Sequence, residues 1–349
     1  MEAARAELSS SLLKASALRS YAIAAEQMGD EKEAREAFAL SSALGWRDTP
    51  TQVRLFQKAI RLGDAPSAVL LADGLARRNQ ALELTIPFLA SAALIPETRG
   101  YVLERLLHEP GWRFRFFATL RQGQELGEIA SFVREYAASG GKMAAEEINP
   151  ILRTFADRGD YAEARSLLET LEPATAQSLI FDGDFSSSPA TGREGAAHPF
   201  EWEMISGGSV NSFVGTPPWS SADRALAVQW RGDVNTSFAA QTLSLEPGDH
   251  LLKISLAAVR QGNIDAFAIE FRCLPGGAGT RPAPISLQKG DPWSVASFRL
   301  DVPSSNCSAQ RLALIVDSQT AGEHSLWVDR VEIAESDAAK KQTRGATSN

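Results

Sequence analysis

The stretch Ser178–Pro189, S-L-I-F-D-G-D-F-S-S-S-P, divides the chain into two parts of different character. Before it, the sequence is rich in Ala, Leu, Glu and Arg, and its apolar residues recur with helical spacing. After it come short alternating runs separated by Gly, Pro and Ser, which are typical of strands and turns. The sequence therefore predicts helices over residues 1–176, an antiparallel β-sandwich over residues 177–335 and a disordered tail over residues 336–349.

The composition is that of an ordinary folded protein. The chain has 349 residues, of which 44% are hydrophobic and 22% charged, and its net charge is −8. The acidic balance argues against a nucleic-acid partner, and no apolar run is long enough to span a membrane. The first residues, M-E-A-A-R-A-E-L, lack the apolar core of a signal peptide. Two expectations stay open: a cytoplasmic protein, or one whose leader or anchor preceded Met1.

The helical part contains a recurring turn. Gly-Asp pairs at Gly29, Gly63 and Gly159 each end one amphipathic run and begin another. A glycine can end a helix with positive φ, and the following Asp can cap the next helix. Five positions after each glycine stands a small residue that lets the two helices approach closely, and nine positions after it stands a residue that fills the groove between them. The first set is Ala34, Ala68 and Ala164, and the second is Phe38, Ala72 and Leu168.

At these residues the chain resembles a tetratricopeptide repeat (TPR) array. The stretches A-I-A-A-E-Q-M-G-D-E-K-E-A-R-E-A-F and I-L-R-T-F-A-D-R-G-D-Y-A-E-A-R-S-L-L carry the resemblance. Between residues 79 and 140 the turn signature is lost, and the pattern predicts helices at Gln80–Leu94, Glu97–His108, Trp112–Arg121 and Glu125–Ala138. The resemblance implies an α-solenoid whose concave face binds a protein partner.

The second part predicts many short strands. They are expected at Leu179–Phe185, Phe200–Met204, Val210–Val214, Ala225–Trp230, Ser237–Leu245, His250–Ala258, Ala266–Cys273, Trp293–Val302, Arg311–Asp317 and Leu326–Ala334. The opening F-D-G-D-F, then P-F-E-W, R-A-L-A-V-Q-W and the closing L-W-V-D-R-V-E-I resemble the jelly-roll sandwich of carbohydrate-binding modules. TPR-like helices joined to such a sandwich are similar to uncharacterised bacterial proteins of exopolysaccharide or envelope function. This resemblance implies a place in the periplasm or cell envelope.

Tryptophans are the residues of this part that best suit a sugar, because flat aromatic rings stack on its C–H groups. Trp219, in the loop T-P-P-W-S-S, and Trp293, after Asp291-Pro292, are expected to be exposed ligand-binding platforms. Trp202, Trp230 and Trp327 lie inside predicted strands, which favours positions in the core.

Three aspartates fall on the first and last predicted strands: Asp182, Asp184 and Asp329. Related modules hold a structural calcium near such positions, and carboxylate oxygens suit that ion. The alternative is that Asp182 belongs to a bend and Asp329 bonds a backbone loop. No other cofactor is expected.

Both cysteines, Cys273 and Cys307, lie in the β-rich part. They are either two separate buried thiols or one disulfide, which requires the strands ending at Cys273 and following Cys307 to be neighbours. On the chain-entropy estimate such a bond stabilises the fold by about 3–4 kcal/mol. It would indicate an oxidising compartment such as a periplasm.

No catalytic constellation is evident in the sequence. The chain is therefore expected to be a non-enzymatic adaptor, with a protein partner on the helices and a glycan on the sandwich. One alternative is a structural scaffold that binds no sugar. The other is a glycan-active enzyme, which would need two carboxylates across a cleft.

Overall fold

The computed structural model describes residues 6, 14–44, 48–173, 178–187, 198–219, 224–258, 262–319 and 321–335. The predicted tail over residues 336–349 lies outside them. The chain forms two compact units, Met1–Lys142 and Met143–Asn349. The predicted change from helix to strand falls near residue 176, whereas the second unit also contains the last two helices of the helical part, α10 (Ala145–Asp157) and α11 (Tyr161–Leu171).

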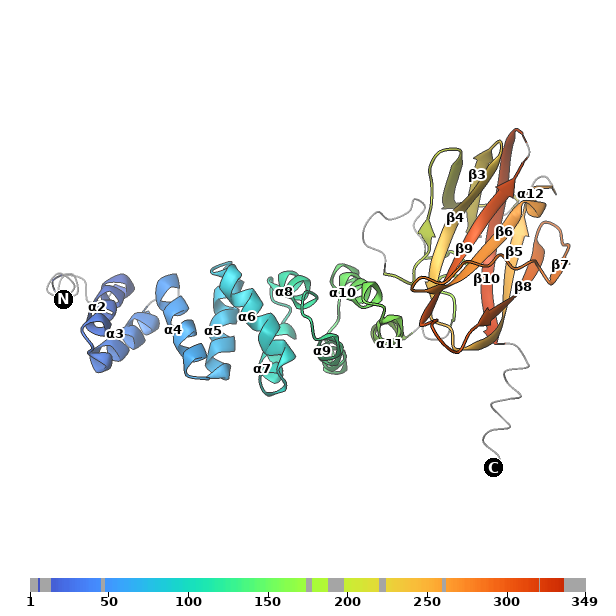
Figure 1. Cartoon of the computed structure of the whole chain (residues 1–349). Coiled ribbons are helices and arrows are strands. Elements are labelled where there is room, and N and C mark those ends of the chain that lie inside the picture. The colour runs from blue at the N-terminus through green and yellow to red at the C-terminus, as the bar shows by residue number, and fades with distance from the viewer. Residues whose placement is uncertain are drawn as a thin grey trace, which may run out of the picture. The chain divides into compact units, whose positions relative to one another are not determined.

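The first unit consists of paired helices, which follow one another in chain order (Figure 1). The four helices predicted between residues 79 and 140 are confirmed, each end lying within two residues of its prediction. The described helices of this unit are α2 (Ala15–Gln27), α3 (Glu31–Leu44), α4 (Thr49–Arg61), α5 (Ala65–Arg77), α6 (Leu82–Leu94), α7 (Pro96–Leu106), α8 (Arg113–Leu120) and α9 (Leu126–Ala138). No described helix is long and apolar enough to cross a membrane.

The Gly-Asp turns form as predicted. Gly29, Gly63 and Gly159 have φ of 81°, 69° and 83°. In each turn the aspartate after the glycine caps the following helix. Its carboxylate accepts a hydrogen bond from the backbone N–H three residues later. The three pairs are Asp30 with Glu33, Asp64 with Ser67 and Asp160 with Glu163. The predicted small residues Ala34, Ala68 and Ala164 are buried at the helix contacts. The hairpin arrangement is confirmed, and its assignment to the TPR family stays a prediction.

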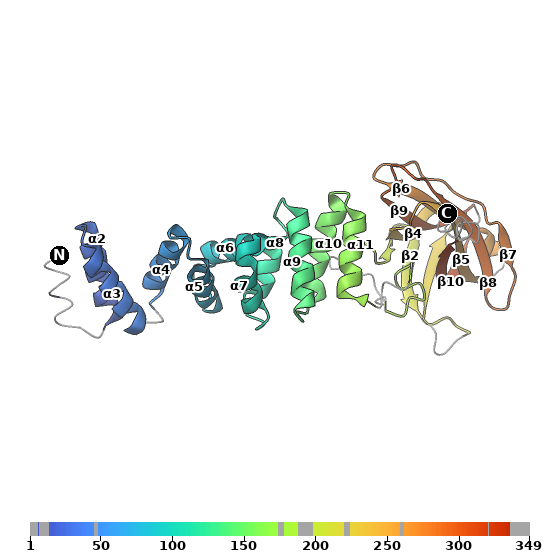
Figure 2. The same cartoon turned by 90° about the horizontal axis from the view of Figure 1, so that it is seen from below.

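The β-rich part consists of two antiparallel sheets packed face to face, as predicted. The four-stranded sheet has the order β1 (Glu203–Met204), β4 (Val234–Leu243), β9 (Ala309–Ser318) and β6 (Phe267–Leu274). The six-stranded sheet has the order β2 (Val210–Gly215), β3 (Ala225–Arg231), β10 (Glu323–Glu335), β5 (Gly248–Ala257), β8 (Ser294–Val302) and β7 (Ser286–Gln288). Figure 2 shows β6 and β9 in one layer and β10, β5 and β8 in the other. From β3 to β6, and again from β8 to β10, successive strands alternate between the sheets.

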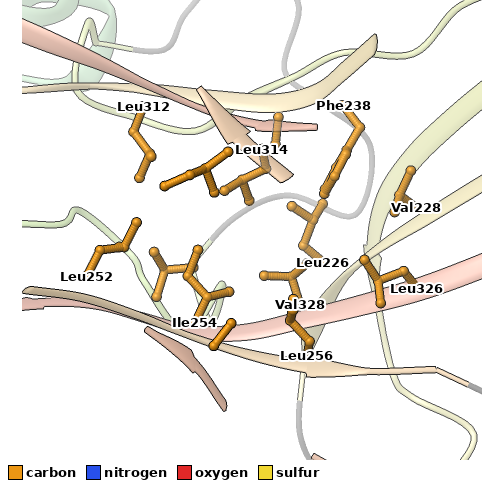
Figure 3. Close-up of a cluster of buried hydrophobic side chains, with 14 of the residues drawn as sticks. Leu226, Val228, Phe238, Leu252, Ile254, Leu256, Leu312, Leu314, Leu326 and Val328 are labelled. Carbon is orange, nitrogen blue, oxygen red and sulfur yellow. The ribbon is translucent and has the colours of Figure 1, made fainter. Parts of the chain in front are cut away.

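The core of the sandwich lies between the sheets. Leucine, isoleucine, valine and phenylalanine side chains from both sheets meet there (Figure 3). Leu312 and Leu314 come from the four-stranded sheet, and Leu252 and Ile254 from the six-stranded sheet. All four are fully or almost fully buried, so apolar residues at alternate strand positions form the core.

One predicted strand is wrong. Leu179–Phe185 forms turns instead, with positive φ at Asp182 and Phe185. The stretch still bonds to β10, because the Val331 N–H donates to the Gly183 carbonyl at 2.8 Å. The pairing of β10 with β5 shifts register between Asp329 and Glu332, so this part of β10 is bulged. A further strand, β7, was not predicted, because its three residues are all exposed and show no alternation.

Candidate functional site

The face of the six-stranded sheet that points away from the core, here called the outer face, carries buried alanines. In β3 the side chains of Leu226, Val228 and Trp230 enter the core, so Ala225 and Ala227 point outward. Both alanines are nevertheless buried, and with Ala257 of β5 they form a cluster separate from the core. Something other than the opposite sheet therefore covers this face.

Four aromatic side chains cover these alanines. We call them the aromatic cluster: Phe213, Trp219, Trp293 and Trp327. They come from β2, from the loop between β2 and β3, from the residue before β8, and from β10. The small alanine side chains leave room for large rings to lie on the sheet, which explains why the alanines are buried.

The rings of the aromatic cluster pack edge to face. The centre of the Trp219 ring lies 6.0 Å from that of Trp293 and 6.3 Å from that of Trp327, with interplanar angles of 80° and 74°. The Phe213 ring lies 6.2 Å from Trp327 at 81°. Such perpendicular contacts are favourable for aromatic pairs and hold each ring in one orientation.

The two predicted platform residues therefore lie together. Trp219 and Trp293 are half-buried, so each keeps part of its ring exposed. The indole N–H of Trp219 is buried and has no hydrogen-bond partner within the described part of the chain. Trp202 and Trp230 belong to the core as predicted, whereas Trp327 points to the outer face, although it is only 9% exposed.

A row of polar side chains lies next to the aromatic cluster. Gln229 of β3 is opposite Asn211 of β2 on one side and Ser325 of β10 on the other. The next row on the same face lies two residues further along each of these strands. It consists of Phe213, Ala227 and Trp327. Same-face neighbours in a strand are about 7 Å apart. The outer face thus combines aromatic rings with amides and a hydroxyl, the side chains that suit a ligand with apolar faces and polar edges.

The structure does not gather the three predicted calcium ligands into one group. Among the described residues, no group of three or more His, Cys, Asp or Glu side chains is arranged to hold a metal ion. Asp182 instead accepts from the Ser187 N–H at 2.9 Å, so the expected bend is closed by its carboxylate. Asp329 accepts from the Arg330 N–H at 2.8 Å. The trio Asp182, Asp184 and Asp329 was predicted from strands that were assumed to pair, and the first of them is a turn.

Asp184 lies in the same turn. Burial by itself would raise the pKa of the Asp184 carboxyl, but the hydrogen bonds from the backbone and hydroxyl of Ser186 outweigh it and hold that pKa below its usual value. The charged carboxylate therefore stabilises the turn after Asp182.

The structure joins Cys273 and Cys307 in a disulfide, with their Cα atoms 4.8 Å apart. Cys273 lies near the end of β6, and Cys307 precedes β9, which pairs with β6. The disulfide therefore links the end of β6 to the residues just before β9.

The helix α11 contacts the sandwich within the second unit. Arg165 donates to the Ser178 carbonyl at 2.9 Å, and its guanidinium lies 5.8 Å from the centre of the Phe200 ring. Next to it, His198 is buried and packs edge to face against Phe181. Burial, followed by the positive charges of Arg165 and Arg153, lowers the pKa of His198 to about 4.

No protein-family model and no curated protein sequence matches this chain. Among solved structures, the chain is similar to a family 16 carbohydrate-binding module, with 10% identity and a TM-score of 0.30 over 45% of this chain and 100% of that one. It is also similar to a CBM4 structure, with 13% identity and a TM-score of 0.31. The match covers 45% of this chain and 99% of that one.

A third match is the enzymatically active domain of the bacteriophage CBA120 tailspike protein 4, with 15% identity and a TM-score of 0.29 over 45% of this chain. This chain covers only 21% of the tailspike chain. At such low identities and TM-scores, none of these likenesses transfers a ligand or an activity to this chain.

Sequence reasoning missed the part that Phe213 and Trp327 play in the aromatic cluster. The only signal was the pair of small residues at alternate positions, Ala225 and Ala227, in a strand otherwise built of large ones. That signal becomes meaningful only when the pairing of β2, β3 and β10 is known, because the rings that cover the alanines lie on other strands.

Proposed function

We propose that this protein is a non-enzymatic adaptor that binds a glycan on the outer face of its sandwich and a protein on its helical hairpins. The observation that carries the glycan part is the aromatic cluster, in which Trp219, Trp293 and Trp327 come together from three separate segments. A soluble domain gains little by leaving tryptophan rings half-exposed on a sheet unless a ligand covers them.

The neighbouring polar row supports the same function. Sugars present C–H faces that stack on aromatic rings and hydroxyl groups that donate and accept hydrogen bonds. Asn211 and Gln229 supply amides that do both, next to rings that supply the apolar contact. The combination fits a glycan better than a wholly apolar ligand.

The experiment is glycan binding by the full chain. We expect the wild-type protein to retain specific polysaccharides on a glycan array, and Trp219→Ala and Trp293→Ala each to weaken that binding at least tenfold. Phe114→Ala is the matched control, because Phe114 is an exposed aromatic residue on a helix of the first unit. A blank array with a well-folded protein contradicts the glycan part, and release of reducing ends from a bound polysaccharide would favour the enzyme alternative.

The proposed protein partner binds the helical hairpins. Several large apolar side chains are exposed there, including Leu40, Leu62 and Leu70. The repeated hairpin turns are the reason to assign these helices to the TPR class, whose surfaces bind proteins. Cross-linking in cells followed by identification of the attached protein tests this part, with Leu62→Glu and Leu70→Glu expected to reduce the cross-link.

The proposed compartment is the periplasm or cell envelope, in connection with exopolysaccharide. The disulfide between Cys273 and Cys307 supports it, since such bonds persist in oxidising compartments. Alkylation of cell extracts before and after reduction tests it. Thiols blocked before reduction contradict an oxidising compartment and favour the cytoplasm.

A structural scaffold that binds no sugar is the second candidate. The contact of Arg165 with Ser178 and Phe200 favours it, because it fixes α11 on the sandwich. Calorimetry of the full chain distinguishes the scaffold from the adaptor. In this candidate Arg165→Ala lowers the melting temperature of the second unit and no glycan changes it, whereas an adaptor is stabilised by its glycan.

A further inference from the structure

A groove of about 700 Å³ lies at the end of the six-stranded sheet where β3 ends and β10 begins. Its volume is in the range of about 300–1,000 Å³ that is usual for ligand pockets. Five of its lining residues lie on the outer face: Asn211, Gln229, Arg231, Glu323 and Ser325. Three of these, Asn211, Gln229 and Ser325, form the polar row beside the aromatic cluster, so the groove continues the proposed glycan site.

These five residues include no aromatic platform. The Trp230 ring also lines the groove, but it belongs to the core between the sheets, and the His324 ring stacks on it. The ring contact that a sugar needs must therefore come from the aromatic cluster next to the groove. We expect one ligand to occupy the groove and the cluster together.

Three rows of side chains follow one another along β3 on the outer face. The first contains Ala227 and belongs to the aromatic cluster, the second contains Gln229, and the third contains Arg231 opposite Glu323. Each residue advances a strand by about 3.4 Å, so Arg231 lies about 14 Å from Ala227. A single sugar cannot contact all three rows, whereas an oligosaccharide that lies along the strand can.

The second and third rows offer hydrogen bonds. Asn211 and Gln229 are exposed, and neither side chain has a hydrogen-bond partner among the residues that the structure describes. Arg231 and Glu323 form an ion pair whose two side chains are also exposed. A guanidinium carries five N–H donors and a carboxylate accepts through two oxygens, so the pair keeps groups for sugar hydroxyls. Because its charges balance, the pair favours a neutral ligand over an anionic one.

The opposite direction along the sheet provides a matched comparison. Lys253 of β5 lies four residues from Ala257, which is opposite Trp327. It is therefore as many residues from the aromatic row as Arg231 is. Beside this path the register of β10 shifts after Asp329, whose carboxylate already accepts a backbone N–H at 2.8 Å. The exposed amides lie in register on the Arg231 side instead.

We propose that the glycan lies along the strands, with one end stacked on the aromatic cluster and the other extending through the groove to the Arg231–Glu323 pair. The ligand is a neutral oligosaccharide, and Asn211 and Gln229 bond the hydroxyl groups of its middle part. This inference rests on the proposed glycan function. It adds the direction of the glycan chain and two residues that determine which length of chain the site prefers.

The test measures binding to the full chain by calorimetric titration with cello-, xylo- and manno-oligosaccharides of two to six residues. We expect at least one series to bind, its hexasaccharide at least tenfold more tightly than its shortest member that binds measurably. Arg231→Ala and Glu323→Ala should each weaken binding of the hexasaccharide about fivefold, the loss of about one hydrogen bond, and leave the shortest member unchanged. Trp219→Ala should weaken binding at every length.

Lys253→Ala is the matched control, because it removes an exposed cation at the same spacing on the other side of the aromatic row. It should leave the affinity for the hexasaccharide unchanged. Hexagalacturonate is the acidic counterpart and should bind at least tenfold more weakly than the neutral hexasaccharide. Because the substituted side chains of Arg231, Glu323 and Lys253 are exposed, the melting temperature should not change, and it is measured alongside.

Each contrary outcome has a distinct meaning. If Lys253→Ala weakens binding of the hexasaccharide and Arg231→Ala does not, the glycan runs in the other direction and the inference is wrong. If neither does while Trp219→Ala weakens binding, the inference is wrong and the proposed function survives. If the acidic probe binds as well as the neutral one, the ligand class is wrong. If no probe binds, the inference and the glycan part of the proposed function both fail.

Discussion

The Val331 N–H donates to the Gly183 carbonyl at 2.8 Å, and the two backbones lie so close that a Cβ at position 183 would be 2.2 Å from the Val331 oxygen. This contact joins the first turn of the sandwich to the bulged part of β10. A non-bonded carbon and oxygen cannot approach so closely, so any residue other than glycine must displace the backbone.

We therefore expect Gly183→Ala to destabilise the second unit by about 2 kcal/mol or more, as overpacking against rigid backbone does. Urea unfolding followed by near-ultraviolet circular dichroism measures the change. Gly207→Ala is the control, since a Cβ there meets nothing within 4 Å. Equal stability of the two variants would show that the turn can move away from β10.

The disulfide should contribute measurably to stability. Replacing Cys273 and Cys307 by serine releases a loop of 34 residues in the unfolded chain, which on the chain-entropy estimate costs about 3–4 kcal/mol. Denaturant titration of the oxidised protein against the double variant measures this difference. Reductant should destabilise the wild type by a similar amount and leave the double variant unchanged. A wild type that is insensitive to reductant would contradict the prediction.

His198 should make the second unit sensitive to acid. Its pKa is lowered to about 4 in the folded protein, mainly by burial and then by Arg165 and Arg153, although Glu201 lies 3.6 Å away. The unfolded chain, with a histidine pKa of about 6.5, binds the proton more tightly. Stability from this group is therefore complete above about pH 6.5 and is lost as the pH falls towards 4, by about 3 kcal/mol in all.

The measurement is the free energy of unfolding from pH 4 to pH 7 for the wild type and for His198→Gln. The variant should have a flatter dependence in this range, because it lacks the titrating group. His108→Gln should keep the wild-type slope, since His108 is exposed. A parallel slope in all three proteins would show that other groups govern the response to acid.

In the first unit, Trp112 should hold α5 and α8 together. The Trp112 indole donates to the Asp73 carboxylate at 2.9 Å, and Asp73 also pairs with Arg77 at 2.7 Å. Trp112→Phe removes the donor and leaves a buried carboxylate oxygen with one partner fewer, so we expect a loss of about 2–3 kcal/mol. Phe114→Leu, at an exposed position nearby, should cost less than about 0.5 kcal/mol. Thermal unfolding of both variants measures these losses in the free energy of unfolding.

The helical part was predictable because its signals are local. A glycine with positive φ and an aspartate that caps the next helix act within a few residues of each other, as at Gly63 and Asp64. The same holds for most strands, whose alternation is set by the side chains of the strand itself. The strand predicted at Leu179–Phe185 failed because Asp182 and Asp184 accept hydrogen bonds from nearby backbone N–H groups and close turns there. The stretch meets β10 through the distant contact of Gly183 with Val331.

The candidate site shows the same division. The sequence alone singled out Trp219 and Trp293 as residues in loops, and it identified the two cysteines that the structure joins. Only the tertiary structure brought Trp219, Trp293 and Trp327 together and placed Asn211 opposite Gln229. It also left the three aspartates ungrouped. The physical reason is strand pairing: alternation shows that a side chain faces one side of a sheet, but only the order and register of the strands decide which residues are its neighbours.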